Sequence, residues 1–278
     1  MYSSSPIQIK DLILNDCKLV IGDGNAISGF KLEEDYVTDG NVVLLEDTLD
    51  LNGYTLTVKG DLILQEGLLK VNNGTLIVEG DLYTYAKYRS QYGGYAYGCL
   101  VMEHTGDLVK IGGDWIMNHE TTCDCVINNG IIELQGDLRR TDSYKYNYDI
   151  GCTLILNGTE KQTVDYPGLQ VKELIVKNNN GEGVELVHDV TVTEKVTDEN
   201  NKLTGKNICI TDFAVVEGFE GNVTWTEDLT LTSDVRFGGN LTINGTLDVG
   251  HASLVVEGDM TISTRANWSW MKQMPMCW

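Results

Sequence analysis

Apolar and polar residues alternate along most of the chain, in short runs that are each followed by a glycine and an acidic or amide residue. The run Leu56–Val58, for example, precedes Gly60 and Asp61. Alternation with a period of two places one set of side chains on a single face of an extended strand. The phrase apolar-x-Gly-Asp/Asn-apolar occurs at 58–62, 78–82, 111–115, 134–138, 237–241 and 256–260. The pattern predicts short strands with one apolar face, and no segment has helical periodicity.

The Gly-Asp phrase returns at intervals near 20 residues. Gly60 and Gly80 are 20 residues apart, and Gly113 and Gly136 are 23 apart. A unit of this length cannot bury its own apolar face and must stack on its neighbours. Glycine adopts backbone angles closed to other residues, and Asp bonds to nearby backbone, so the pair suits a corner between strands. We predict an all-β fold, a single-stranded parallel β-helix (β-solenoid); antiparallel hairpins are the alternative.

Two segments interrupt the repeat. The interval between Gly80 and Gly113 holds a tyrosine-rich stretch, which we predict to be a loop inserted into one coil. No Pro-rich or Ser-rich linker divides residues 1–263, so we predict one β-solenoid domain there. Residues 264–278 break the pattern and are rich in Trp and Met, which predicts a C-terminal cap over the open apolar end. The alternative is a tail that a partner or modifying enzyme recognises through Trp268, Trp270, Lys272, Cys277 and Trp278.

The charge of the chain narrows the range of partners. With 41 acidic and 20 basic residues, the net charge is −21. Such an excess disfavours binding to nucleic acid or to an anionic bilayer. No apolar run is long enough to span a membrane, and residues 1–10 lack the basic start and apolar core of a secretion signal. We therefore expect no nucleic acid and no membrane insertion, and the oligomeric state stays open.

Seven cysteines, at positions 17, 99, 123, 125, 152, 209 and 277, are scattered without the compact framework of a disulfide-rich module. This scatter favours reduced, buried thiols that fill small core positions. The alternative is a metal site built from His119, Cys123 and Cys125, but this set lacks the four-ligand spacing of structural zinc sites. We predict no metal and no cofactor.

One long stretch has a counterpart in known proteins. Leu49–Leu82 (LDLNGYTLTVKGDLILQEGLLKVNNGTLIVEGDL), the tyrosine-rich loop, Leu154–Val164 (LILNGTEKQTV) and Leu174–Val192 follow one another in the chain. This order resembles a repeat segment in large surface-exposed proteins of clostridia and related Gram-positive bacteria. The resemblance covers residues 30–200, with a partial echo at Leu229–Ser263. It implies a spacer or display scaffold and an extracellular or cell-surface location. A cytoplasmic location is the alternative, because no signal peptide is recognisable.

Tyrosines crowd two segments that the repeat places on nearby coils. Aromatic rings offer flat faces to sugars and amphipathic contacts to proteins, so these segments predict a binding surface for a glycan or protein ligand. Packing of the rings over an adjacent corner is the alternative. The candidate binding residues are Tyr83, Tyr85, Tyr88, Tyr92, Tyr95, Tyr97, Tyr144, Tyr146 and Tyr148.

Catalysis on this fold needs a carboxylate pair, or a base beside a bound cation and a basic residue. Most repeated acids occupy the Gly-Asp corner, where turn geometry explains them. Arg139 and Arg140, with Asp137 and Asp142, form a mixed cluster that we interpret as solvated charge. We therefore predict no catalytic residue and no enzyme activity: the protein is a non-catalytic, adhesin-like scaffold. A carbohydrate-active enzyme, a polysaccharide lyase or glycoside hydrolase, is the alternative, followed by a scaffold that presents the Trp-rich tail.

Overall fold

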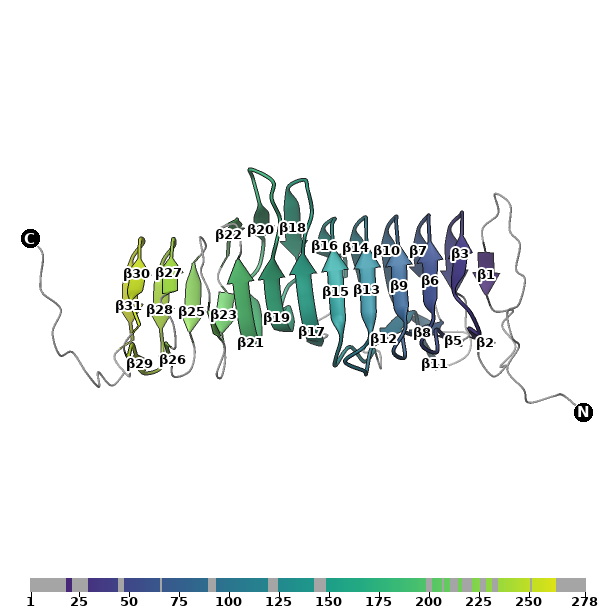
Figure 1. The fold of residues 1–278 in the computed structure, drawn as a ribbon, viewed down its shortest axis with the longest axis horizontal. Helices are drawn as coiled ribbons and strands as arrows, with labels where there is room; N and C mark the ends of the chain where they lie inside the picture. The colour runs from purple at the N-terminus through teal and green to yellow at the C-terminus, as the bar shows by residue number, and fades with distance from the viewer. Residues whose placement is uncertain are drawn as a thin grey trace, which may run out of the picture.

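In the computed structural model, secondary structure is all β in the part of the chain that is described. The described residues are 19–21, 30–44, 48–65, 67–89, 94–119, 125–142, 149–198, 202–206, 208–210, 215–216, 222–225, 229–231, 235–250 and 252–263. Short strands succeed one another along a single axis, from β1 (Leu19–Ile21) to β31 (Met260–Ile262) (Figure 1). The predicted all-β class is confirmed.

Three sheets run along the stack and form its sides. The ten-stranded sheet is ordered β1, β4 (Val42–Leu44), β7 (Leu62–Leu64), β10 (Leu82–Arg89), β14 (Trp115–His119), β16 (Leu138–Arg140), β18 (Gln162–Asp165), β20 (Val184–Leu186) and β22 (Leu203–Gly205), with β11 (Gly94–Tyr97) paired to β10. The four-stranded sheet is ordered β12 (Cys99–Val101), β8 (Leu68–Lys70), β5 (Thr48–Asp50) and β2 (Phe30–Lys31).

The largest sheet has thirteen strands. Its order is β3 (Tyr36–Thr38), β6 (Thr55–Val58), β9 (Thr75–Val78), β13 (Leu108–Ile111), β15 (Ile131–Leu134), β17 (Asp149–Leu156), β19 (Gln170–Val176), β21 (Val190–Asp198), β23 (Ile208–Ile210), β25 (Val223–Trp225), β28 (Leu241–Ile243) and β31, with β24 (Val215–Val216) paired to β21. Two short pairs complete the C-terminal coils: β26 (Leu229–Thr230) with β29 (Leu247–Asp248), and β27 (Val235–Phe237) with β30 (Leu254–Val256).

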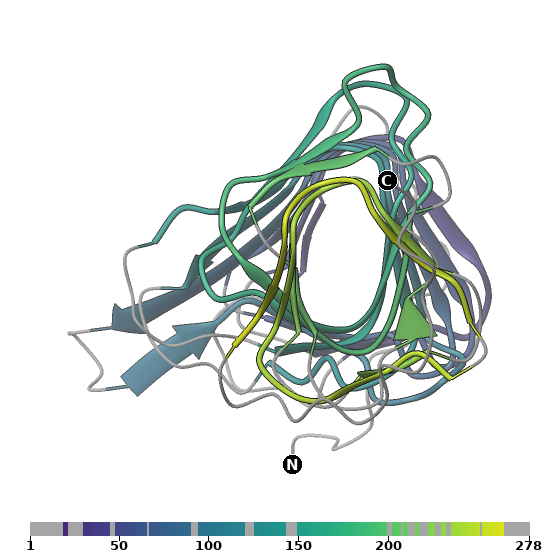
Figure 2. The ribbon, with the colours of Figure 1, turned by 90° about the vertical axis from the view of Figure 1, so that its left-hand side faces the viewer.

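Strand pairing follows the repeat. Leu56 of β6 is paired with Leu76 of β9, one 20-residue unit later, and the two strands are parallel. Among the described strands the pair β10–β11 is antiparallel and the others are parallel. The chain therefore coils as a parallel β-helix, and the hairpin alternative is wrong except for β10–β11. Viewed along the stack, the coils enclose a common axis and the β10–β11 hairpin extends beyond them (Figure 2).

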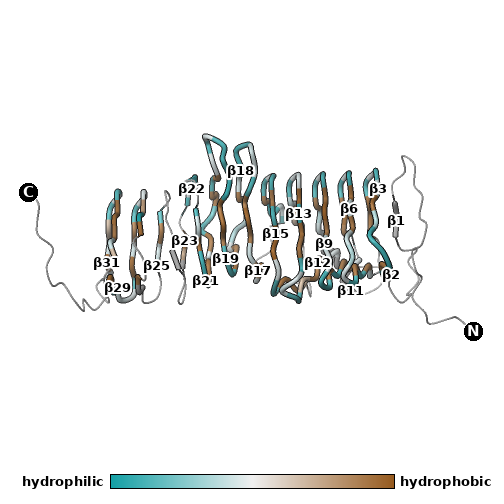
Figure 3. Tube along the Cα trace, viewed as in Figure 1, coloured by the Kyte–Doolittle hydropathy of each residue, from teal (hydrophilic) through white to brown (hydrophobic). Residues whose placement is uncertain are grey.

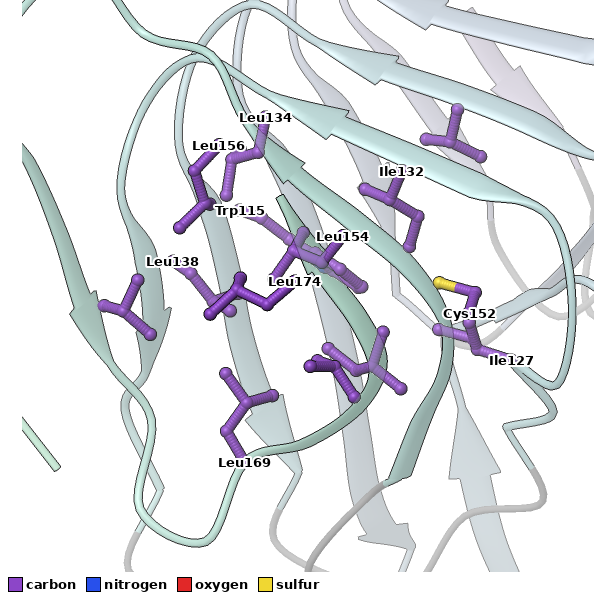
Figure 4. Close-up of a cluster of buried hydrophobic side chains, with 14 of the residues drawn as sticks. Trp115, Ile127, Ile132, Leu134, Leu138, Cys152, Leu154, Leu156, Leu169 and Leu174 are labelled. Carbon is purple, nitrogen blue, oxygen red and sulfur yellow. The ribbon is translucent and has the colours of Figure 1, made fainter. Parts of the chain in front are cut away.

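The core is made of columns of aliphatic side chains that point toward the axis. In the thirteen-stranded sheet one column contains Leu76, Ile132 and Leu154, each 0% exposed, together with their register partners. Apolar and polar residues alternate along the trace of successive coils (Figure 3). The buried positions of the core are the apolar ones. In the middle of the stack Trp115 lies among leucines contributed by adjacent coils (Figure 4).

The Gly-Asp corner forms a ladder of hydrogen bonds parallel to the axis. The backbone N–H of Asp81 donates to Asp61 Oδ1 at 2.9 Å, that of Asp114 to Asp81 Oδ1 at 2.8 Å, and that of Asp137 to Asp114 Oδ1 at 2.8 Å. Asn41 begins this ladder, and the N–H of Thr163 ends it on Asp137. Each aspartate therefore fixes the backbone of the coil above it.

The corner glycines are required by close packing. None of the corner positions has a positive φ, so the prediction that glycine is needed there for its backbone angles is wrong. A Cβ on Gly80 would lie 2.8 Å from the carbonyl oxygen of Gly60, and one on Gly113 would lie 2.8 Å from that of Gly80. Stacked corners leave no room for a side chain at this position.

Candidate functional site

Three neighbouring strands of the ten-stranded sheet, β10, β14 and β16, end at one corner of the stack, which we call the loop corner. The chain leaves the ten-stranded sheet at the ends of β10, β14 and β16, which are neighbours in that sheet. It returns at Gly98, at Cys125 and at Asp149. Because the three strands are parallel, they end at the same edge of the sheet. The strand that begins the first tyrosine-rich segment, β10, and the strand that precedes the second, β16, are therefore two coils apart; residues 143–148 of the second segment lie outside the described residues.

Of the candidate tyrosines, Tyr83 and Tyr85 have described side chains, and both lie on the outer face of β10. The rings of Tyr83 and Tyr85 are parallel, with an interplanar angle of 7° and centroids 6.1 Å apart. Tyr83 is flanked in register by Ile63 on the preceding coil and Ile116 on the next. These three side chains and that of Tyr85 are partly exposed. This arrangement forms an aromatic and aliphatic platform beside the loop corner.

Both phenols stay neutral over a wide pH range. Burial and the hydrogen bond that the Tyr83 hydroxyl donates to Asp81 Oδ2, 3.0 Å long, raise the pKa of Tyr83 from 10.0 to about 12. Burial also raises the pKa of Tyr85. Neutral phenols present ring faces and hydroxyl groups to a ligand without adding charge to an acidic surface.

Charged groups line the same face next to the platform. Arg139 occupies the position after Ile116 in the outward column, and its guanidinium reaches Asp114 Oδ2 at 3.4 Å and Asp137 Oδ2. The side chain of Arg139 is 50% exposed, and the hydrogen bond to Asp137 raises its pKa. The face thus combines flat apolar surface with carboxylate acceptors and a guanidinium donor.

The mixed cluster around Arg140 is buried, and the prediction that it is solvated is wrong for this pair. Arg140 Nη2 lies 2.8 Å from Asp142 Oδ1, and the two side chains are 2% and 3% exposed. The guanidinium carbon lies 5.5 Å from the ring centroid of Tyr166. Arg140 points inward because it follows the inward Leu138 by two residues in β16. The pair links the end of β16 to Asp142, the last described residue before 143–148.

A disulfide joins Cys99 to Cys125, so the prediction of reduced thiols is wrong for these two residues. It ties the return point of the β10–β11 excursion to that of the next coil's excursion. Cys125 is consequently no metal ligand, which overturns the alternative metal site that included it. Cys152 is a buried free thiol, as predicted, and burial raises its pKa to about 12.

The remaining candidate residues are placed only in part. Tyr88 is paired with Tyr95, and Tyr97 with Ala86, across the β10–β11 hairpin, and His119 ends β14. The other candidates lie outside the described residues: Tyr92, Tyr144, Tyr146, Tyr148, Cys123, Trp268, Trp270, Lys272, Cys277 and Trp278. Within the described ranges no group of three His, Cys, Asp or Glu side chains is placed to hold a metal ion.

Sequence reasoning missed the disulfide and the burial of the Arg140–Asp142 pair. A signal for the disulfide existed, since the Met102–Ile127 bridge places Cys125 in register with Leu100, one residue from Cys99. The buried ion pair had a signal in the alternation of β16, which assigns Arg140 to the inner face. Neither signal can be read before the register of the coils is known.

Comparison of the chain with protein-family models, curated proteins and solved structures found no match. In the part of the chain that the structure describes, no helix is long and apolar enough to cross a membrane.

Proposed function

We propose that the protein is a rigid, non-catalytic scaffold of a bacterial surface that binds a glycan through the tyrosine platform and the loop corner. The observation that carries this proposal is the pair of parallel rings, Tyr83 and Tyr85, on the outer face of β10, beside a corner fixed by the Cys99–Cys125 disulfide and the Arg140–Asp142 pair. Binding segments carried on a rigid frame lose little conformational freedom when they engage a ligand.

A glycan suits the chemistry of this face. The parallel rings of Tyr83 and Tyr85 match the apolar faces of sugar rings, and Asp81 and Arg139 offer acceptor and donor groups for hydroxyls. A protein ligand is the competing partner, because tyrosine and arginine are also enriched at protein interfaces. Clustered phosphates do not suit the row of aspartates beside the platform.

The corner aspartates support a role without catalysis. In Asp81, Asp114 and Asp137 one carboxylate oxygen accepts a backbone N–H, which holds the side chain in the ladder. A general acid or base must be free to exchange a proton with substrate. These carboxylates instead perform a structural task in each coil.

A surface location is supported by the disulfide as well as by the resemblance to surface proteins. Disulfides persist in oxidising compartments and are rare in the reducing cytosol. The net charge of −21 favours solubility and suppresses lateral association of strand edges.

A glycan array probed with the full-length protein tests the proposal. We expect binding to a subset of glycans, which is lost in a Tyr83→Ala/Tyr85→Ala variant and kept in Tyr83→Phe/Tyr85→Phe, because phenylalanine retains the rings. Ile155→Ala, on the outer face of the thirteen-stranded sheet, is the matched control and should bind as the parent does.

Three outcomes contradict parts of the proposal. Shortened oligosaccharides after incubation would identify a carbohydrate-active enzyme. An array without signal, combined with platform-dependent capture of a defined surface protein, would identify a protein ligand.

Replacing Tyr92, Tyr95 and Tyr97 together by Ala should abolish binding with little change in melting temperature. A large fall in the melting temperature would mean that these rings are structural.

A further inference from the structure

The last described coil exposes positions that are buried in the coils before it. Leu241 in β28 is 0% exposed, whereas its register partner Met260 in β31 is 41% exposed. Phe237 in β27 is 0% exposed, and its partner Val256 in β30 is only partly buried. We call β29, β30 and β31 the C-terminal rim; they lie at the end of the stack in Figure 1. At this rim the aliphatic columns of the core are cut open.

Backbone groups at the rim continue the pattern of the coils below. The N–H of Leu241 donates to the carbonyl of Asp259 at 2.9 Å, in the next coil. The N–H of its partner Met260 points the same way, and the described residues offer it no acceptor. The side-chain carboxylate of Asp259 likewise accepts no backbone N–H from the described residues, although the N–H of Asp259 donates to Asn240 Oδ1 at 2.7 Å. The last described coil thus exposes both apolar side chains and backbone groups that would be covered by a further coil.

Residues 264–278 have the composition to cover this surface. They follow β31 and Ser263 directly in the chain, and the segment is 15 residues long. Its large apolar side chains are Trp268, Trp270, Met271, Met274, Met276 and Trp278. Trp brings a large flat apolar area, and Met adapts to irregular gaps. An open stack needs such a cap, because exposed core and strand edges promote association.

Charge also favours this segment over a second copy of the chain. It contains Arg265 and Lys272 and no acidic residue, whereas Asp248 lies in the rim and Asp259 in the turn between β30 and β31. Glu257, in the same turn, is paired with Arg236. A second copy would bring the same acidic residues and a net charge of −21 against this end of the stack. We propose that residues 264–278 dock on the C-terminal rim and close the open core, with the tryptophans over the apolar columns.

Hydrogen exchange and sedimentation of the full-length chain test this docking. The variants are a chain truncated after Ser263 and Trp268→Ala/Trp270→Ala/Trp278→Ala at full length; Ser269→Ala/Gln273→Ala is the matched control. We expect the amides of residues 254–263 to be protected in the parent and the control. Both test variants should lose that protection and self-associate as concentration rises, while exchange in β9 and β13 stays slow and reports an intact fold.

Two results overturn the proposal. Equal exchange of residues 254–263 in the parent and truncated chains would mean that nothing in 264–278 covers the rim. A parent chain that sediments as a dimer and is made monomeric by Met260→Asp would make a second copy the occupant.

Discussion

The Cys99–Cys125 disulfide stabilises the fold by an amount that the structure allows to be worked out. The bond closes a loop with a sequence separation of 26 residues. In the loop-entropy treatment, a cross-link of this span removes about 3.5 kcal/mol of conformational freedom from the unfolded chain. For a protein of this size that free energy corresponds to a melting temperature higher by roughly 6 °C. Because Cys99 is fully buried, replacing it also removes packing contacts.

Reduction separates the cross-link from the packing. We expect calorimetry of the parent protein to show a melting temperature lower by roughly 6 °C in reductant, because the sulfur atoms stay in place and only the bond is lost. Cys99→Ala/Cys125→Ala should melt at least as low as the reduced parent, since it also leaves a small cavity. Reductant should leave the melting temperature of this double variant unchanged, which makes it the internal control.

Two observations would refute the reasoning. Alkylation of Cys99 or Cys125 in the unfolded, unreduced protein, located by peptide mapping, would mean that the bond is absent. A fully reduced parent that melts within about 1 °C of the oxidised protein would mean that the cross-link contributes nothing to stability.

Three further predictions concern the corner ladder, the core and the platform. Asp114→Ala should lower the free energy of unfolding by about 1–3 kcal/mol, because a backbone N–H loses its acceptor, whereas Asp114→Asn keeps an acceptor and should be nearly neutral in urea unfolding. Leu154→Ala should cost about 2–5 kcal/mol by the same measurement, and Ile155→Ala, on the outer face, less than about 1 kcal/mol. Since the pKa of Tyr83 is raised to about 12, its contribution to stability is present below pH 10 and is lost between about 10 and 12; phenolate absorbance should show Asp81→Asn lowering this pKa.

Much of the fold follows from local pattern. The alternation of apolar and polar residues predicts which side chains point inward, and the spacing of the Gly-Asp pairs predicts the length of a coil. Both can be read from the sequence because each coil carries similar residues at the positions that stack on the coil before it. The pattern gave the wrong reason for the corner glycines, since a close approach between coils is a tertiary fact that no single repeat contains. The sequence groups Asp142 with Arg140, but their charges favour a solvated pair, and only the inward register of β16 shows that both side chains are buried.

The site was harder to predict than the frame. Tyrosine clustering pointed to β10, and Tyr83 does lie on an outer face with Tyr85. The disulfide could not be found from spacing alone, because Cys99 and Cys125 are 26 residues apart, more than one 20-residue unit, and only the register of the coils shows that they are neighbours. A disulfide between coils depends on which residues of neighbouring coils are in register. This register is known only when the whole stack is aligned.

The corner ladder also bears on how such a protein changes length during evolution. Each rung joins the carboxylate or amide of one unit to the main chain of the following unit, so every internal unit supplies the same half-bond that it receives. Duplicating the 20 residues that separate Gly60 from Gly80 would reproduce both halves and require no compensating substitution. Gene duplication would thus lengthen the β-solenoid in steps of about 4.8 Å and set the distance between the tyrosines and its amino-terminal end.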